Sequence, residues 1–136
     1  MPTFGPDIKA RFVPPLDAAM ISANAVAITT AGDYPGATLV DLGSTRIGNP
    51  GNLGMWFVPS GLTGGTNVKW TLMSDADGTA GSEVTEFTSR VYTTAELEPV
   101  CIPLPPLSGR RYWRAQATST GTYTAGSYTA WIGPIN

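Results

Sequence analysis

The sequence contains no histidine and a single cysteine, Cys101. Zinc sites, Ser-His-Asp triads and Cys-His pairs all need those residue types, so each of these centres is excluded or nearly so. One cysteine can form no internal disulfide, and in an alternating apolar segment it is typical of a small buried side chain. We therefore expect a protein that is not an enzyme and that needs neither a cofactor nor a metal.

Charged residues are scarce as well. They make up 13% of the chain and leave a formal net charge of −2. The two lysines and six arginines are scattered, whereas a protein that follows nucleic-acid phosphates needs clustered basic residues. We expect no nucleic-acid partner. So little charge predicts either a surface solvated by threonine, serine and asparagine or a surface partly covered by a partner.

Long apolar runs are absent too, since no stretch approaches the 18 or so residues of a membrane span. We expect no membrane partner. Lys9 and Arg11 precede an apolar stretch as they would in a signal peptide, but Pro14, Pro15 and Asp17 interrupt that stretch. Export by a signal peptide is therefore not expected.

What the chain does contain is short alternation of apolar and polar residues, bounded by glycine and proline. The clearest cases are three segments in the last third, which place on one face Val100, Ile102 and Leu104, then Trp113, Ala115 and Ala117, then Tyr128, Ala130 and Ile132. This period of two predicts three strands, which we expect to form a closing β-meander. Weaker patterns lie over residues 21–30, 38–42, 53–58, 68–73 and 87–93, with loops at 32–36, 43–52 and 59–66. The chain is thus predicted to be an all-β, antiparallel sandwich of about eight strands, of jelly-roll or immunoglobulin-like type.

The N-terminal residues differ from this pattern. Residues 1–20 are predicted to form an extended arm ahead of a single sandwich domain, residues 21–136, because prolines at positions 2, 6, 14 and 15 favour extended chain. Such an arm is either a disordered leader or a strap on a neighbouring subunit. Its apolar side chains favour the strap, and the candidate contacts are Phe4, Arg11, Phe12, Val13, Pro14 and Pro15.

The aromatic residues leave an alternative open. Trp70 and Trp113 lie on apolar faces and are predicted to be core. Trp56, Tyr92, Tyr112 and Trp131 lie on faces that can point outward, where aromatic rings serve as platforms for sugars. A carbohydrate-binding sandwich on a virion or cell surface is therefore a second hypothesis.

Acidic residues suggest a third, less favoured hypothesis, a carboxylate-based glycosidase. The acids concerned share one polar stretch and are Asp75, Asp77, Glu83 and Glu86. Residues 75–78 also resemble the start of a calcium loop, but the ligand spacing of an EF-hand is not present, and a polar turn is the preferred interpretation.

The closing third resembles the capsid cement, or head decoration, proteins of tailed bacteriophages, of the jelly-roll type. The matching segments are Ile102-Pro103-Leu104-Pro105, Arg111-Tyr112-Trp113-Arg114, and residues 121–126 running into residues 128–132, with Val40-Asp41-Leu42-Gly43 and residues 70–75 upstream. The likeness covers roughly residues 38–132, and its motifs are structural rather than catalytic.

This resemblance implies a structural virion protein that binds the outer surface of the capsid, bridges adjacent major capsid proteins and resists the pressure of packaged DNA. The expected partners are the major capsid protein and further copies of the chain, as a homodimer or homotrimer. Synthesis in the host cytoplasm is implied. Beside the arm residues, the candidate contacts are Trp56, Tyr112 and Trp131.

Overall fold

The computed structural model describes residues 18–42, 53–105 and 110–135. These residues contain ten strands: β1 (Ile21–Ala27), β2 (Gly32–Pro35), β3 (Val40–Asp41), β4 (Leu53–Thr63), β5 (Asn67–Asp75), β6 (Val84–Thr88), β7 (Tyr92–Thr93), β8 (Val100–Pro103), β9 (Tyr112–Thr120) and β10 (Ala125–Pro134). Two short 3-10 helices, η1 (Ala18–Met20) and η2 (Thr94–Glu96), complete the described secondary structure.

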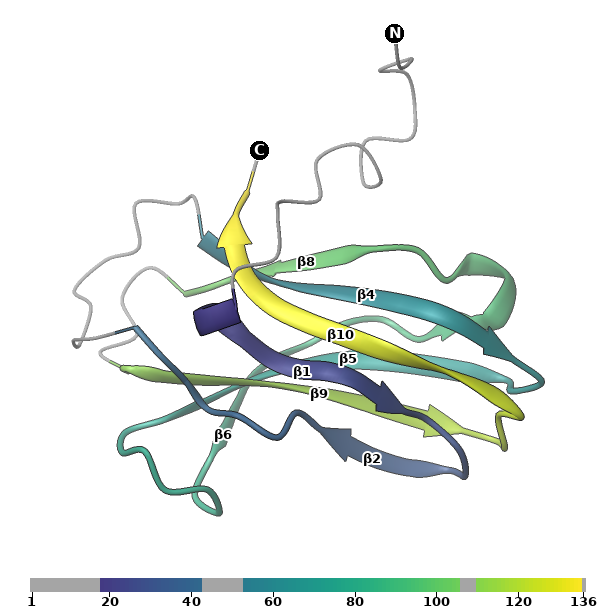
Figure 1. Ribbon diagram of the computed structural model, residues 1–136, viewed down its shortest axis with the longest axis horizontal. Coiled ribbons are helices and arrows are strands. Elements are labelled where there is room, and N and C mark those ends of the chain that lie inside the picture. Colours follow the sequence, from purple (N-terminus) through teal and green to yellow (C-terminus); the bar gives the residue numbers. More distant parts are fainter. Residues whose placement is uncertain (1–17, 43–52, 106–109, 136) are drawn as a thin grey trace, which may run out of the picture.

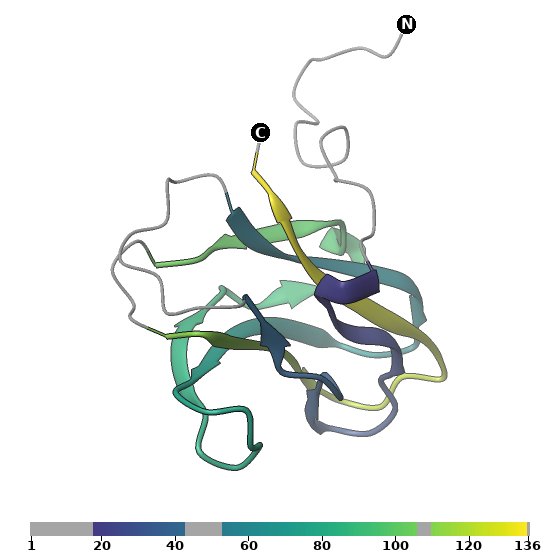
Figure 2. The ribbon, with the colours of Figure 1, turned by 60° about the vertical axis from the view of Figure 1, so that its left-hand side comes forward.

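The strands form two antiparallel sheets that pack face to face, as the two layers of Figure 1 show. The four-stranded sheet has the order β1-β10-β4-β8, and the six-stranded sheet has the order β2-β9-β5-β6, with β3 beside β9 and β7 beside β5. If β2 with β3, and β6 with β7, each count as one interrupted strand, the sandwich has eight strands. Every connection crosses between the sheets except the one from β5 to β6, which is the connectivity of a jelly roll. The prediction of an antiparallel sandwich of about eight strands is therefore confirmed. Figure 2 shows the same two layers from a second direction.

The predicted closing meander is wrong. β8 pairs with β4 and β10 pairs with both β1 and β4, whereas β9 lies in the other sheet between β2 and β5. Alternation shows which face of a strand is buried but does not show which strand lies beside it. Each of the last two connections therefore crosses from one sheet to the other.

Three boundaries also differ from expectation. β4 continues through Pro59 to Thr63. A proline is tolerated at this position because β8 pairs only with residues 54–57, so no strand on the β8 side needs a backbone N–H from Pro59. The predicted turn at residues 32–36 contains the edge strand β2. The strand expected over residues 87–93 is divided into β6, which begins earlier at Val84, and the short β7.

The core lies between the sheets and is centred on aromatic rings. Trp70 of β5 is fully buried, with its ring 5.3 Å from Phe57 of β4 and 5.5 Å from Tyr128 of β10. Trp113 is 1% exposed. The predictions that Trp70 and Trp113 are core residues are confirmed.

Candidate interaction surfaces

The outer face of the four-stranded sheet carries a row of apolar side chains across all four strands. Trp131 of β10 pairs with Ile21 of β1 on one side and with Trp56 of β4 on the other, and Trp56 pairs with Cys101 of β8. Residues directly opposite each other in an antiparallel pair project to the same side. The neighbours Met55 and Ile132 belong to the core, so the row Ile21, Trp131, Trp56 and Cys101 faces away from it. We call this surface the tryptophan face.

Both tryptophans of this face are nevertheless buried. Trp56 is 4% exposed and Trp131 is 5% exposed. Trp56 Nε1 donates to the Pro134 carbonyl at 3.1 Å, whereas Trp131 Nε1 is buried with no hydrogen-bond partner. An N–H group in that state costs about 1–3 kcal/mol. Both rings therefore lie on the outward side of the sheet, but neither is the exposed sugar platform that the second hypothesis needs.

Small residues and the C-terminal end complete the tryptophan face. Gly54 pairs with Gly133 of β10 and Pro103 of β8. A methyl group at Gly54 would lie 3.1 Å from Ile135 Cδ1, which places the Ile135 side chain over this glycine. Burial raises the pKa of the Cys101 thiol to about 12, so the thiol stays protonated at neutral pH and behaves as an apolar group.

The two sheets differ completely in charge. No residue of β1, β4, β8 or β10 is acidic or basic. The charged residues within strands all belong to the six-stranded sheet and are Asp33, Asp41, Lys69, Asp75, Glu86 and Arg114. A sheet whose outer face is open to water normally carries polar side chains on that face. The uncharged outer face is therefore the stronger candidate for a covered surface.

Tyr112 lies on the other side of the sandwich from Trp56 and Trp131. It is a half-buried residue of β9, opposite Asp75 of β5, and its ring lies against Gly78, where an added methyl group would be 3.3 Å from Tyr112 Cε1. Tyr92 is half-buried and packs against the core, so its predicted outward orientation is wrong. The structure thus brings Trp56 and Trp131 together but separates them from Tyr112.

The four acids of the glycosidase hypothesis hold the structure around the β5–β6 connection. Asp75 is 1% exposed and accepts from the Asp77 backbone N–H and from the Ser82 hydroxyl. Asp77 accepts from the Thr79 backbone N–H. The remaining pairs are Glu83 with Arg114, and Glu86 with the Ser74 hydroxyl at 2.6 Å. These contacts are those of a structured polar turn.

Neither a metal centre nor a membrane span emerges from the described ranges. Residues 18–42, 53–105 and 110–135 contain no group of three or more cysteines or acids placed to hold a metal ion. Within the same part of the chain, no helix has the length and apolar character needed to cross a membrane.

The ion pair between Glu83 and Arg114 predicts how the protein responds to acid. Burial alone would raise the pKa of the Glu83 carboxyl, but the N–H groups of Gly81 and Glu83 and the Arg114 guanidinium outweigh burial and hold that pKa below 4.5. A carboxyl with a lowered pKa in the folded state stabilises the protein above its unfolded pKa, and this contribution is lost as the pH falls through the folded pKa.

The E83Q variant is therefore expected to lose less stability than the wild type between about pH 5 and pH 3. Urea unfolding across this range measures the slope of the unfolding free energy against pH. Identical slopes for the two proteins would contradict the assignment of this stabilisation to Glu83.

A second surface lies along the edge of the six-stranded sheet, and sequence reasoning did not identify it. Residues 84–93 run beside β5 and expose three large apolar side chains, Val84 (43% exposed), Phe87 (54%) and Val91 (50%). We call these three side chains the β6 edge. The available signal was the presence of Phe87 and Val91 in a strand whose other residues are polar.

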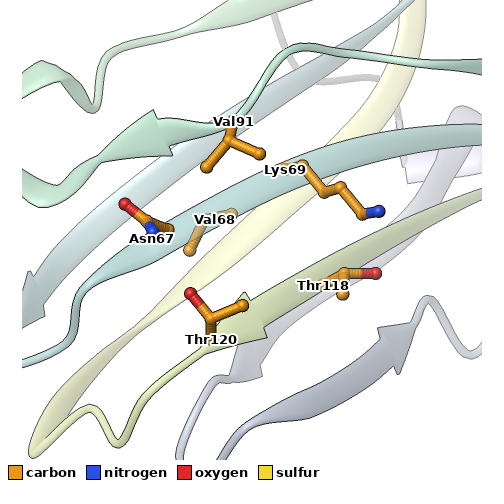
Figure 3. Close-up of a pocket in the computed structure, with 6 residues that line it drawn as sticks. All are labelled: Asn67, Val68, Lys69, Val91, Thr118 and Thr120. Atoms are coloured by element: carbon orange, nitrogen blue, oxygen red, sulfur yellow. The ribbon is translucent and has the colours of Figure 1, made fainter.

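A shallow hollow adjoins the β6 edge on the outer face of the six-stranded sheet. It encloses about 120 Å³ and is lined by Asn67, Val68, Lys69, Val91, Thr118 and Thr120. Figure 3 shows Val91 on one side, the β5 residues along the floor, and Thr118 and Thr120 of β9 on the other side. Although four of these residues are polar, the surface that they expose in the hollow consists mainly of apolar atoms. The hollow therefore suits one apolar side chain of a partner.

The arm candidates, Phe4, Arg11, Phe12, Val13, Pro14 and Pro15, lie outside the described residues. Their predicted contacts remain predictions. Searches with the whole chain find no matching protein-family model and no matching curated protein.

Proposed function

We propose that the protein is a structural virion protein that binds the outside of a bacteriophage head, bridges adjacent major capsid proteins and stabilises the shell. The jelly-roll sandwich agrees with the fold that the resemblance implies. The segments that carry the resemblance belong to β3, β5, β8, β9 and β10, which are strands of both sheets. A non-enzymatic role also agrees with the structural contacts made by the four acids.

The observation that carries the proposal is the exposed β6 edge. Edge strands present unpaired backbone groups, and proteins usually protect them with charge or proline. Here the edge carries Glu86 and Arg90 but also exposes Phe87 and Val91 beside an apolar hollow. Such a surface suits a partner that adds a strand or inserts an apolar side chain.

A modest interface is sufficient for this role. Specific interfaces bury about 800 Å² on each partner, and many weaker contacts made by copies bound to one shell add through multivalency. Contacts between copies, as a homodimer or homotrimer, would add to those with the capsid protein. The carbohydrate-binding alternative now lacks three of its four proposed platforms, Trp56, Tyr92 and Trp131, and retains Tyr112 as a half-buried one.

The purified protein is expected to bind heads of the phage that carries its gene, when those heads are prepared without it. Binding measured by co-sedimentation should saturate at a fixed number of copies per head, and the occupied heads should disrupt at a higher temperature. No saturable binding, together with positive signals on a glycan array, would replace the proposal by the carbohydrate-binding alternative.

A double variant tests the proposed contact surface directly. F87S combined with V91S removes exposed apolar groups and is expected to weaken head binding while leaving the melting temperature of the free protein nearly unchanged. T85S, at an exposed position of the same strand, is the matched control and should bind as the wild type does. Wild-type affinity of the double variant would exclude the β6 edge as the contact.

A further inference from the structure

The segment that forms the β6 edge has a sequence that is complementary to itself. Residues 84–92 read VTEFTSRVY, with an acid, Glu86, and a base, Arg90, placed symmetrically on either side of Thr88. We propose that two copies of the chain pair through this edge as antiparallel strands, with a two-fold axis at Thr88. The inference names a second copy as the partner that adds a strand, and it rests on the proposed function for the choice of this edge as an interaction surface.

The edge is open to solvent in the single chain. Across residues 18–42, 53–105 and 110–135, the exposed large apolar side chains are Val84, Phe87 and Val91, at 43%, 54% and 50%. β6 is also the last strand of the six-stranded sheet, as Figure 1 shows. The edge therefore combines unpaired backbone groups with apolar surface, and another strand can add to such an edge.

The hydrogen bonds to β5 determine which backbone groups of the edge are available. The Ser89 N–H donates to the Trp70 carbonyl at 2.8 Å, so residue 89 turns toward β5. In an antiparallel pair, alternate residues direct both their N–H and their C=O toward the same neighbour. Thr88, which lies opposite Thr71, therefore directs both groups away from β5. Two copies of Thr88 can exchange two hydrogen bonds across a two-fold axis.

The charges favour the same register. With Thr88 on the axis, Glu86 of each copy lies opposite Arg90 of the other, and opposite charges in these positions stabilise a strand pair. Glu86 Oε2 accepts from the Ser74 hydroxyl, and a carboxylate has further acceptor sites for a guanidinium. Arg90 is exposed, and Glu96 lies 3.4 Å from it. A register with Glu86 on the axis would instead place two like charges opposite each other.

The pairing also covers apolar surface. Phe87 lies opposite Ser89 of the other copy, so the two Phe87 rings take diagonal positions on one face, within reach of each other. A strand adds in the plane of the sheet, so the hollow beside Val91 stays open on the face of the sheet and remains available to a capsid. Because the paired segment is short, the interface is small, and we expect monomers and dimers in equilibrium at micromolar concentrations.

Sedimentation velocity of the free protein between about 5 µM and 500 µM is the first test. The average mass should rise from 14.2 kDa toward twice that value as the concentration increases. F87S should require about tenfold more protein for the same rise, because it removes apolar surface from the contact. A monomer at every concentration, or a trimer, would overturn the inference.

Mixing two charge variants tests the register. E86R places arginines opposite each other and R90E places acids opposite each other, so each variant alone should dimerise about tenfold more weakly than the wild type. An equimolar mixture should recover wild-type association, because every charge in the heterodimer has an opposite partner. D33R, a charge reversal on the opposite edge strand β2, is the matched control and should associate as the wild type does. No recovery on mixing would exclude the register.

A cysteine on the axis provides a covalent test. Residues directly opposite in antiparallel strands have Cα atoms about 4.5–5.5 Å apart, within the range of a disulfide. In the C101A background, T88C should therefore oxidise to a cross-linked dimer. T85C is the control, because its two copies would lie about 20 Å apart. Equal cross-linking of T85C and T88C would overturn the placement of the axis.

These measurements use no phage heads, so their outcomes separate the inference from the proposed function. Dimers that show the mixing recovery but bind no heads would support the inference and contradict the proposed function. Monomers that bind heads with a saturable number of copies would support the proposed function and overturn the inference.

Discussion

Replacing Trp70 by alanine is expected to lower the free energy of unfolding by about 3–5 kcal/mol, the usual cost of emptying a large aromatic site. The ring of Trp70 lies between the sheets, stacked on Phe57 at 30° and tilted against Tyr128 at 49°. Its removal takes contacts from both sheets at once. Against a total stability of about 5–15 kcal/mol, the melting temperature should fall by roughly 10–20 °C.

Two further variants identify the origin of this loss. W70F keeps a ring against Phe57 and also removes an indole N–H that is buried without a partner, so it should lose less than W70A. F87A truncates an aromatic residue that is 54% exposed and should change the unfolding free energy by about 0.5 kcal/mol or less. Equal losses for W70A and F87A in urea unfolding would contradict the described core.

Replacing Gly126 by alanine is expected to cost about 2–6 kcal/mol, because a strained backbone and an overfilled contact add together. Gly126 has φ +109°, a backbone conformation that residues other than glycine rarely adopt. A methyl group there would also lie 2.5 Å from the backbone N and Cα of Leu62. The clash is with backbone atoms of β4, so the adjacent strand itself must move.

Gly61 is the matched control for this substitution. It has φ +65°, but a methyl group would meet nothing within 4 Å. G61A should therefore show only the conformational cost, about 1–2 kcal/mol. If urea unfolding gave the same loss for both alanine variants, the close approach of β10 to β4 at Leu62 would be excluded as a cause.

The buried faces of individual strands were predictable from the sequence because alternation is a local property. Trp113, Ala115 and Ala117 all lie in the core, as their period of two predicts. The assignment of strands to sheets was not predictable in the same way. β8, β9 and β10 have similar patterns, yet the middle one belongs to the other sheet, since a pattern within one strand contains no information about its neighbours.

For the candidate surfaces too, the face of a strand was predictable from the sequence but its neighbours were not. Residues 53–58 are apolar on both faces of the strand, a pattern typical of a strand that is central in its sheet, and β4 is central, between β10 and β8. That Trp56 meets Trp131 depends on the register of β4 with β10, which brings together residues far apart in the chain. The β6 edge was missed because the sequence does not show that Phe87 and Val91 lie beyond the last strand of a sheet.

The position of the last two long strands has a consequence for synthesis on the ribosome. β9 lies between β2 and β5, and β10 lies between β1 and β4, so each sheet lacks an inner strand until the final quarter of the chain has been made. Ribosomes add about 5–20 residues per second, and during that time the uncharged strands β1 and β4 have no neighbour that joins them. The sandwich therefore cannot close before β9 and β10 have been made, and a nascent chain that stalls before residue 112 presents the unpaired apolar edges of β1 and β4 to other nascent chains.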